Sequence, residues 1–393
     1  MTETLAGLTD PPTRPTVAAG ASRGRRPVDL VTVGVEEEFL LYDLAAAQPA
    51  QVAERVMAAV ADAGRPPVQH EFLTTQIEIA SQPVLDLADL GEELSALRRT
   101  VATAAATVGA ALVAVGAPPL AFDQTPRVFD TPRFRRMVTE VGALAPGPGV
   151  CGTHIHVGID DRDLGVQVIN HMRPWLPVLG ALGTNSPYFG GNDTGYASWR
   201  AMVWGQWPSV ESPPHLRSAA DYDATVARLI DSGALMDYGM LYWHARLSAH
   251  VPTVEVRVGD VGLTAADTVL AAALVRALAA TGLRLARAGV MADPVPHHVL
   301  SAAHWRSARD GLRGHTFDPA TGAFAPTQRV LGRLVALVTP ELRRHGDLGM
   351  VTVGVARARS QGAGADRQRA VTQAAGAHAL LPYLAEQTVV PTR

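Results

Sequence analysis

Three segments of the chain place ionisable side chains two residues apart. These pairs are Glu36 and Glu38 in GVEEEF, His154 and His156 in GTHIHVG, and Glu255 and Arg257 in TVEVRVGD. Residues i and i+2 of a β-strand project from the same face, so each pair points to one side of its strand. The alternate positions are mainly valine and isoleucine, which predicts strands with one apolar and one polar face.

The polar faces predict a metal site if the strands share one sheet. A cluster of carboxylates is stable only when cations offset its repulsion. Glutamate oxygens with one or two imidazoles favour hard cations, with Mg²⁺ first and Mn²⁺ as the alternative. Side chains on one strand face are roughly 6.5–7 Å apart, so Glu36 and Glu38 are expected to serve two neighbouring metals. Several metals beside an arginine suit phosphoryl transfer.

The order of strand and helix patterns along the chain predicts an α+β fold. Its sheet is expected to be mainly antiparallel and its C-terminal third helical. Residues 1–28 are expected to be a disordered leader and residues 29–393 a single domain. The expected strands cover 30–42, 68–80, 111–115, 152–159 and 253–258. The expected helices cover 50–63, 86–108, 162–186, 221–232, 264–289, 298–312, 326–345 and 365–385. The strand 68–80 adds Gln76 and Glu78 to the polar face. Residues 187–214 are expected to be a long aromatic loop, either a lid or packing.

Composition excludes several classes of function. All 34 basic residues are arginine, so the chain has neither a lysine Schiff base nor a P-loop. A net charge of −3 argues against nucleic-acid binding. The single Cys151 fits a reducing compartment, and we expect a cytoplasmic protein. The apolar stretch near 265–282 is interrupted by Asp267 and Arg276, which predicts a core helix and not a membrane span.

Four motifs in order resemble the carboxylate–amine ligases related to glutamate–cysteine ligase type 2. They are GVEEEF at 34–39, Glu71 with QIEIAS at 76–81, GTHIHVG at 152–158 and TVEVRVGD at 253–260. Smaller matches are FRRM at 134–137, SPYFGGNDTGYASWR at 186–200 and RDGLRG at 309–314. The resemblance runs from about residue 30 to beyond 310.

The resemblance implies a glutamine-synthetase-like fold, in which helices cover the outer face of a curved antiparallel sheet, and an enzyme that uses ATP and Mg²⁺. It implies small-molecule substrates joined through an acyl phosphate, with glutamate and cysteine as the family's pair; a homo-oligomer is also an expectation. The metal ligands by motif match are Glu36, Glu38, Glu78, His154 and Glu255. The catalytic residues would be Arg257 and Glu78. The substrate- and nucleotide-binding residues would be Arg257, Arg200, Arg246, His156, Glu71 and Arg136.

The chain departs from the family pattern at one place. Relatives tend to read Gly-Thr-His-Pro where this sequence has GAPP at 116–119, so a histidine near the site is missing. Two other functions stay open on the residues alone. One is a metal-dependent amidohydrolase that uses His154 and His156, and the other is a catalytically weakened relative that only binds a metabolite.

Several other features have simpler interpretations. GPGVCG at 147–152 precedes a strand instead of opening a helix, so it does not fit a dinucleotide site. Cys151 is expected to enter that strand as a packing residue. Glu37 falls on the apolar face, where we expect a strand end or a buried ion pair.

Overall fold

A sheet of eight antiparallel strands carries all the polar pairs found in the sequence. The computed structural model describes residues 30–64, 68–123, 125–145, 147 and 149–392, so the leader expected over 1–28 lies outside it. Among these residues the strand order is β3-β4-β1-β6-β10-β9, and β2 and β5 also pair with β1. The strands are β1 (Val33–Asp43), β2 (Gln48–Pro49), β3 (Gln69–His70), β4 (Gln76–Ala80), β5 (Ala111–Val113), β6 (Gly152–Gly158), β9 (Ala245–Leu247) and β10 (Thr253–Asp260).

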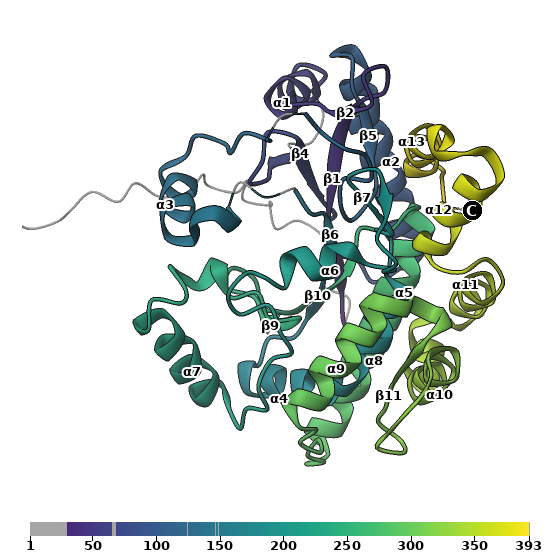
Figure 1. Ribbon diagram of the computed structural model, residues 1–393. Helices are drawn as coiled ribbons and strands as arrows, with labels where there is room; N and C mark the ends of the chain where they lie inside the picture. Colours follow the sequence, from purple (N-terminus) through teal and green to yellow (C-terminus); the bar gives the residue numbers. More distant parts are fainter. Residues whose placement is uncertain (1–29, 65–67, 124, 146, 148, 393) are drawn as a thin grey trace, which may run out of the picture. The chain divides into compact units, whose positions relative to one another are not determined.

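Most helices pack on one face of this sheet and continue through the C-terminal third, whereas the helices Pro132–Val141 and Trp199–Trp204 lie on the other side (Figure 1). The helices before β10 are α1 (Ala53–Asp62), α2 (Leu87–Thr107), α3 (Pro132–Val141), α4 (Arg162–Met172), α5 (Leu176–Leu182), α6 (Trp199–Trp204) and α7 (Ala219–Asp231). The later ones are α8 (Ala265–Arg287), α9 (His297–Asp310), α10 (Thr327–His345), α11 (Leu348–Gln361), α12 (Gly364–Ala375) and α13 (Leu380–Thr388). The expected α+β fold with an antiparallel sheet is confirmed.

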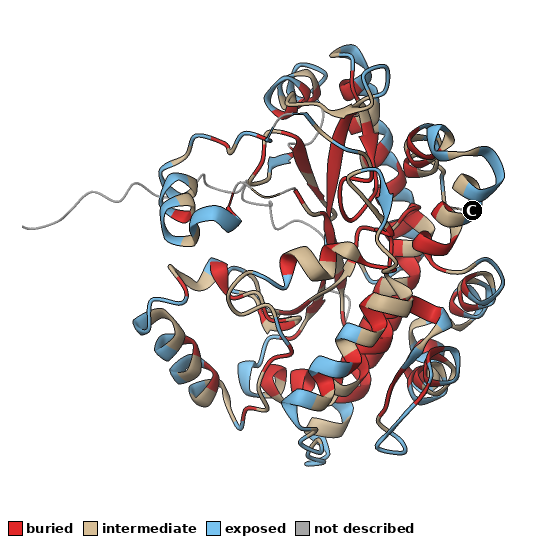
Figure 2. Cartoon of the chain, in the orientation of Figure 1, coloured by how far each residue is buried: buried red, intermediate tan, exposed pale blue. Residues whose placement is uncertain are grey.

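The helix α8 is the centre of the hydrophobic core. Its length and hydropathy would let it cross a membrane, but 78% of its most apolar window is buried inside the protein. Figure 2 shows the buried positions concentrated on α8 and the strands that it faces. The helix begins at a capping box, in which Thr264 and Asp267 exchange hydrogen bonds. Residues 265–282 therefore form the expected core helix.

Four boundaries differ from the sequence-based expectation. The strand expected over 68–80 is split into β3 and β4, because the chain reverses between them and the two strands pair antiparallel with each other. The helix expected over 162–186 is broken into α4 and α5 around Pro174, since proline removes a helical hydrogen bond. The helix expected over 365–385 is likewise two helices, α12 and α13. The loop 187–214 contains the helix α6 and the small hairpin of β7 (Tyr188–Phe189) and β8 (Asn192–Asp193).

Glu37 lies in a buried ion pair that fixes the sheet to its helices. Its carboxylate accepts a hydrogen bond from Arg98 Nε of α2 at 2.9 Å and from Thr268 Oγ1 of α8 at 2.5 Å. Both charged side chains are fully buried. Because Glu36 and Glu38 alternate with Glu37, this contact directs them to the opposite face of the sheet.

Removing Arg98 is expected to destabilise the fold strongly. Arg98→Met would leave the Glu37 carboxylate buried without a partner, which costs about 3–5 kcal/mol in the free energy of unfolding. Urea denaturation of the two proteins measures this difference. The double variant Glu37→Leu/Arg98→Met is expected to regain most of the loss. Equal destabilisation of the single and double variants would contradict this account.

Candidate active site

The open face of the sheet carries a row of carboxylates and imidazoles that crosses four neighbouring strands. The register places Glu38 opposite Glu78 of β4 and Glu36 opposite His154 of β6. On β10, Glu255 lies opposite His156. Antiparallel pairing thus brings together residues that are up to about 220 positions apart in the sequence, as the shared strand faces predicted.

Two sets of possible metal ligands meet at Glu36. In one set, single ligand atoms of Glu36, Glu78 and His154 all lie within 4.8 Å of one another. In the other, Glu36 is joined by His156 and Glu255 within the same limit. One carboxylate between two ligand sets is the arrangement in which a glutamate bridges two cations.

Each of the two histidines has a ring nitrogen close to the Glu36 carboxylate. His156 Nδ1 is 2.9 Å from Thr253 Oγ1, while its Nε2 is buried without a hydrogen-bond partner and lies 3.6 Å from a Glu36 oxygen. His154 lies between Glu36 and Glu38, at 3.4 and 3.5 Å. Burial, with Arg257 nearby, lowers the pKa of His154 and keeps its imidazole neutral.

The carboxylates of the row repel one another. Burial, and then the charges of Glu36, Glu71 and Glu38, raise the pKa of Glu78 well above its usual value. Burial, and then the charges of Glu38 and Glu36, raise the pKa of Glu71 to about 8. Burial also opposes ionisation of Glu36, but His154 and His156 outweigh it and hold the pKa of Glu36 well below its usual range. The row therefore has excess negative charge that a cation would relieve.

Arginines border the row on the β10 side. An extra residue between Val256 and Gly259 forms a β-bulge, and Arg257 lies in it. Its guanidinium donates to Glu255, which also accepts from Arg246 Nε at 2.8 Å. These two cations lower the pKa of Glu255 despite its burial. Arg246 therefore holds Glu255 in place, in addition to its expected role toward substrate.

Arg200 is a buried cation held by packing. Its guanidinium stacks on the ring of Trp204 at 4.6 Å, and its Nε has no hydrogen-bond partner. On the other side is Gly152, where a Cβ atom would lie 2.3 Å from an Arg200 nitrogen. Ser198 caps the helix α6 that carries both Arg200 and Trp204. Arg200 thus retains free donors for an anion.

One carboxylate ties this helix to the sheet. Asp260, at the end of β10, accepts hydrogen bonds from Ser186 Oγ and Ser198 Oγ, both at 2.7 Å, and from the backbone N–H of Asn185 at 2.7 Å. A strand and the segment 185–198 are therefore locked together. No sequence pattern indicates this role, because Asp260 is simply the last residue of a motif.

We expect Gly152→Ala to lower activity by displacing Arg200. The new methyl group would overlap the guanidinium, and a shift of about 1 Å in a positioning group can cost about 100-fold in rate. Steady-state kinetics would measure the loss, and a melting curve would show whether the fold is retained. Gly349→Ala is the matched control, because nothing lies within 4 Å of its Cβ position. Wild-type activity of Gly152→Ala would contradict this role of Arg200.

A cavity of about 650 Å³ opens over the row. Its lining includes Glu36, Glu38, Glu71, Glu78, His154, Arg200 and Arg257, all of which the sequence had singled out. Arg136 does not line it: this side chain is exposed on α3 and lies 3.8 Å from Glu140. Arg133, one turn earlier, lines the cavity instead and binds Asp237 at 2.9 Å.

The aromatic residues of segment 187–214 divide between two roles. Trp204 and Trp207 line the cavity. Tyr196 contacts Trp199 and also Trp305 of α9, and none of these three belongs to the described lining, so they serve packing. Tyr242 and Phe72 also line the cavity, and the sequence gave little signal for them because they lie outside the motifs.

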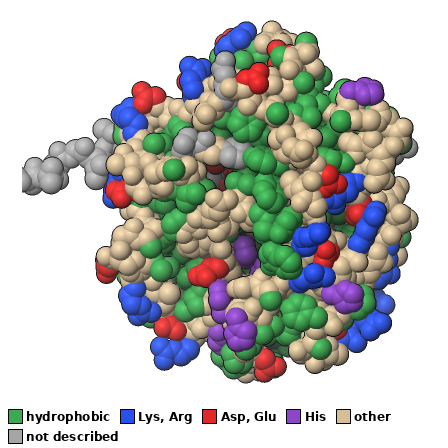
Figure 3. Space-filling view, in the orientation of Figure 1, with side chains coloured by type: hydrophobic (Ala, Val, Ile, Leu, Met, Phe, Trp, Pro, Cys, Tyr) green, Lys and Arg blue, Asp and Glu red, His purple; other side chains and the backbone are tan. Residues whose placement is uncertain are grey.

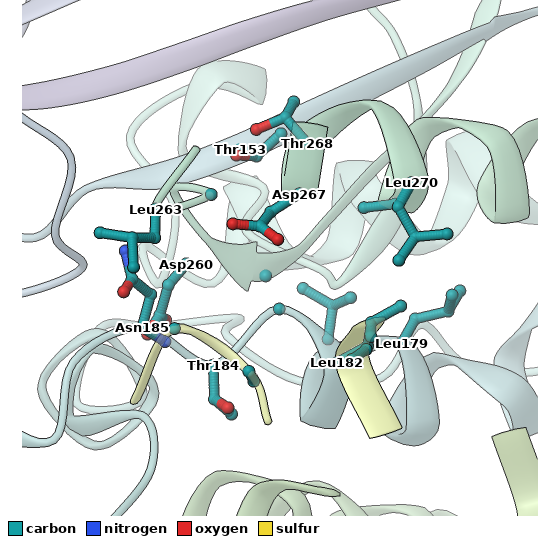
Figure 4. Close-up of a pocket in the computed structure, with 18 of the residues that line it drawn as sticks. Thr153, Leu179, Leu182, Thr184, Asn185, Asp260, Leu263, Asp267, Thr268 and Leu270 are labelled. Atoms are coloured by element: carbon teal, nitrogen blue, oxygen red, sulfur yellow. The ribbon is translucent and has the colours of Figure 1, made fainter. Parts of the chain in front are cut away.

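Other features of the molecule do not compete with this cavity. A space of about 50 Å³ between β10, α5 and α8 is bordered by leucines and belongs to the core (Figure 4). Cys151 is buried, and burial raises the pKa of its thiol, which leaves it poorly suited to act as a nucleophile. On the face shown in Figure 3, acidic and basic side chains are interspersed with apolar areas.

Comparison with known proteins identifies the family. The model of glutamate–cysteine ligase family 2 matches residues 32–381. The chain belongs to this family. A protein of Salinispora tropica, provisionally named glutamate–cysteine ligase 2, is 48% identical over 363 residues, which cover 92% of this chain and 96% of the relative. A Mycobacterium relative, provisionally named glutamate–cysteine ligase 2-2, is 46% identical over 91% of this chain and 98% of its own.

Solved structures of low sequence identity share the fold. Glutamate–cysteine ligase from Francisella tularensis, in complex with AMP, superposes with a TM-score of 0.70 at 12% identity and covers 92% of this chain and 89% of its own. A bifunctional glutathione synthetase from Pasteurella multocida gives 0.65 at 17% identity, over 92% of this chain and 52% of its own. The expected family, the fold and the class of ATP-dependent carboxylate–amine ligase are confirmed.

Proposed function

We propose that the protein uses ATP and two Mg²⁺ ions to join the γ-carboxylate of glutamate to an amine, namely cysteine or a related compound, and that it works in the cytoplasm. The observation that carries this proposal is Glu36, which lines the cavity and is shared by two sets of potential ligands. The acid and the amine are inferred from the names of the relatives.

The residues present fit divalent cations. The buried Nε2 of His156 has no hydrogen-bond partner and faces Glu36, while the raised pKa values of Glu71 and Glu78 mark excess negative charge. Glu36, Glu38, Glu78, His154 and Glu255 would hold the ions. Bound there, Mg²⁺ would neutralise phosphate charge, with Mn²⁺ as an alternative.

The proposed reaction has two steps. A carboxylate oxygen of the acid attacks the γ-phosphorus of ATP, the bond to the β,γ-bridging oxygen breaks, and ADP leaves. The amine nitrogen then attacks the acyl carbon and loses a proton, and phosphate departs with one oxygen of the original carboxylate. Arg257 and Arg200 would stabilise the charge that develops in both steps.

Release of ADP provides the first test. Purified protein would be incubated with ATP, Mg²⁺, glutamate and a panel of amines, and mass spectrometry would identify the amide. With ¹⁸O in the acid, one label is expected to appear in phosphate. Glu38→Ala is expected to abolish amine-dependent ADP release. Absence of ADP with every acid–amine pair would overturn the proposal.

The alternative of an amidohydrolase is not favoured, because the family and the fold are those of ligases. Incubation of γ-glutamyl amides with the protein in the absence of nucleotide would test it directly. Hydrolysis without nucleotide would support the amidohydrolase.

A further inference from the structure

One wall of the cavity is aromatic. Phe134 of α3 contacts Phe72 with ring centroids 5.2 Å apart, Phe72 contacts Trp207 at 6.1 Å, and Trp207 contacts Tyr242 at 6.1 Å. Each contact is nearly perpendicular, at 87–89°. We call these four residues, all of which line the cavity, the aromatic wall. Such edge-to-face contacts hold the rings in place and leave flat apolar surface toward a ligand.

The aromatic wall adjoins the residues proposed to act on the acyl group. The ring of Trp204 lies 5.9 Å from Tyr242 and 5.9 Å from the Arg257 guanidinium carbon, so it links the wall to the arginine. Phe72 follows Glu71 directly in the chain. A group bound on the wall would therefore lie next to the reacting centre.

This position suits the acceptor amine better than the adenine of ATP. When the γ-phosphate is at the row, the triphosphate and the ribose separate adenine from it. The substituent of an amine is attached directly to the attacking nitrogen, so it must lie beside the reacting carbon. The wall offers that substituent an apolar surface.

Charges near the wall disfavour an acceptor with a carboxylate. Arg133, next to Phe134, is bound by both oxygens of Asp237, at 3.0 and 2.9 Å. The other arginines of the described lining are Arg257, which donates to Glu255, and Arg200, which lies beside the row. The proposed function assigns both to the phosphate and the acid, so no arginine of the described lining is left for a second carboxylate beside the wall.

We propose that the acceptor is a primary amine that carries an aromatic or large apolar group and no carboxylate, and that it binds on the aromatic wall. This inference rests on the proposed ligase function and departs from it in the second substrate, which would then be an amine other than cysteine.

Four amines would separate the effect of the aromatic ring from the effect of the carboxylate. The reference compound is 2-phenylethylamine. Phenylalanine adds a carboxylate to it, ethylamine lacks its ring, and cysteine is the amine named for the family. With ATP, Mg²⁺ and glutamate, 2-phenylethylamine is expected to give a kcat/KM roughly tenfold or more above each of the others, as expected for a filled apolar pocket. Trp207→Leu is expected to raise the KM for 2-phenylethylamine roughly tenfold without changing that for ATP. The matched control is Trp305→Leu, because Trp305 lies on α9 and its side chain is 45% exposed.

The outcomes distinguish a failure of this inference from a failure of the proposed ligase function. Efficient use of cysteine or phenylalanine, with poor use of 2-phenylethylamine, would overturn the inference and leave the ligase intact. A raised KM for ATP alone in Trp207→Leu would also overturn it, because adenine would then occupy the wall. ADP release with none of the amines would overturn the ligase function and the inference together. If Trp207→Leu does not fold, Phe134→Leu makes the same test on another element.

Discussion

Glu36→Gln is expected to lower amine-dependent ADP release by about a thousandfold, because it removes a charge from both ligand sets at once. The amide keeps the size of the side chain, so the loss would reflect charge and not packing. Initial rates at saturating Mg²⁺ and ATP would measure it. The same measurement should give a higher Mg²⁺ concentration at half-maximal rate.

The matched control for this prediction is Glu54→Gln, an exposed glutamate on α1. It is expected to keep wild-type activity. A Glu36→Gln enzyme with more than a tenth of wild-type activity would show that the shared carboxylate is not at the centre of the site.

Glu78→Gln is expected to lower activity by about 100- to 1,000-fold. It is also expected to raise the melting temperature of the metal-free protein. Neighbouring glutamates and burial raise the pKa of Glu78, so its charge destabilises the empty fold. Glu36 differs, because the histidines lower its pKa and its charge stabilises the fold. Glu36→Gln should therefore lower the same melting temperature. Thermal melts in EDTA would compare the two variants.

The pH dependence of the metal-free protein follows from the same charges. Glu71 has a pKa of about 8 when folded, against 4.5 normally, so the folded state keeps a proton that the unfolded state releases. Its contribution to stability is complete below pH 4.5 and is lost as pH rises toward 8. Glu78 acts in the same direction, so the wild-type protein is expected to lose more stability over this window than Glu78→Gln. Saturating Mg²⁺ should reduce the loss, and parallel curves for both proteins would contradict this explanation.

The sequence predicted the chemistry of the site better than its walls. A period of two on β1, β6 and β10 was enough to place Glu36, His154 and Glu255 on one face, because side-chain alternation is local and regular. The same logic put Glu37 on the other side, where it pairs with Arg98. Strand order was not evident from these patterns, and the structure alone shows it.

The parts that sequence analysis missed depend on long-range contacts. The pattern over 68–80 predicts one strand, yet the chain reverses between β3 and β4, where Leu73 pairs with the distant Val128. The bulge that carries Arg257 and the hairpin of β11 (His315–Asp318) and β12 (Ala323–Pro326) have no distinct local pattern. Arg136 and Arg133 belong to the same basic helix, and only its packing decides which of them reaches the cavity.

Asp260 joins the two elements that carry the arginines of the site. Its hydrogen bonds to Ser186 and Ser198 couple the helix of Arg200 to the strand of Arg257. The two guanidiniums therefore belong to one hydrogen-bonded unit, and β10 in turn pairs with β6 and carries Glu255 of the row. The spacing between the two cations, and between them and the carboxylates, is thus built into the sheet before any anion binds.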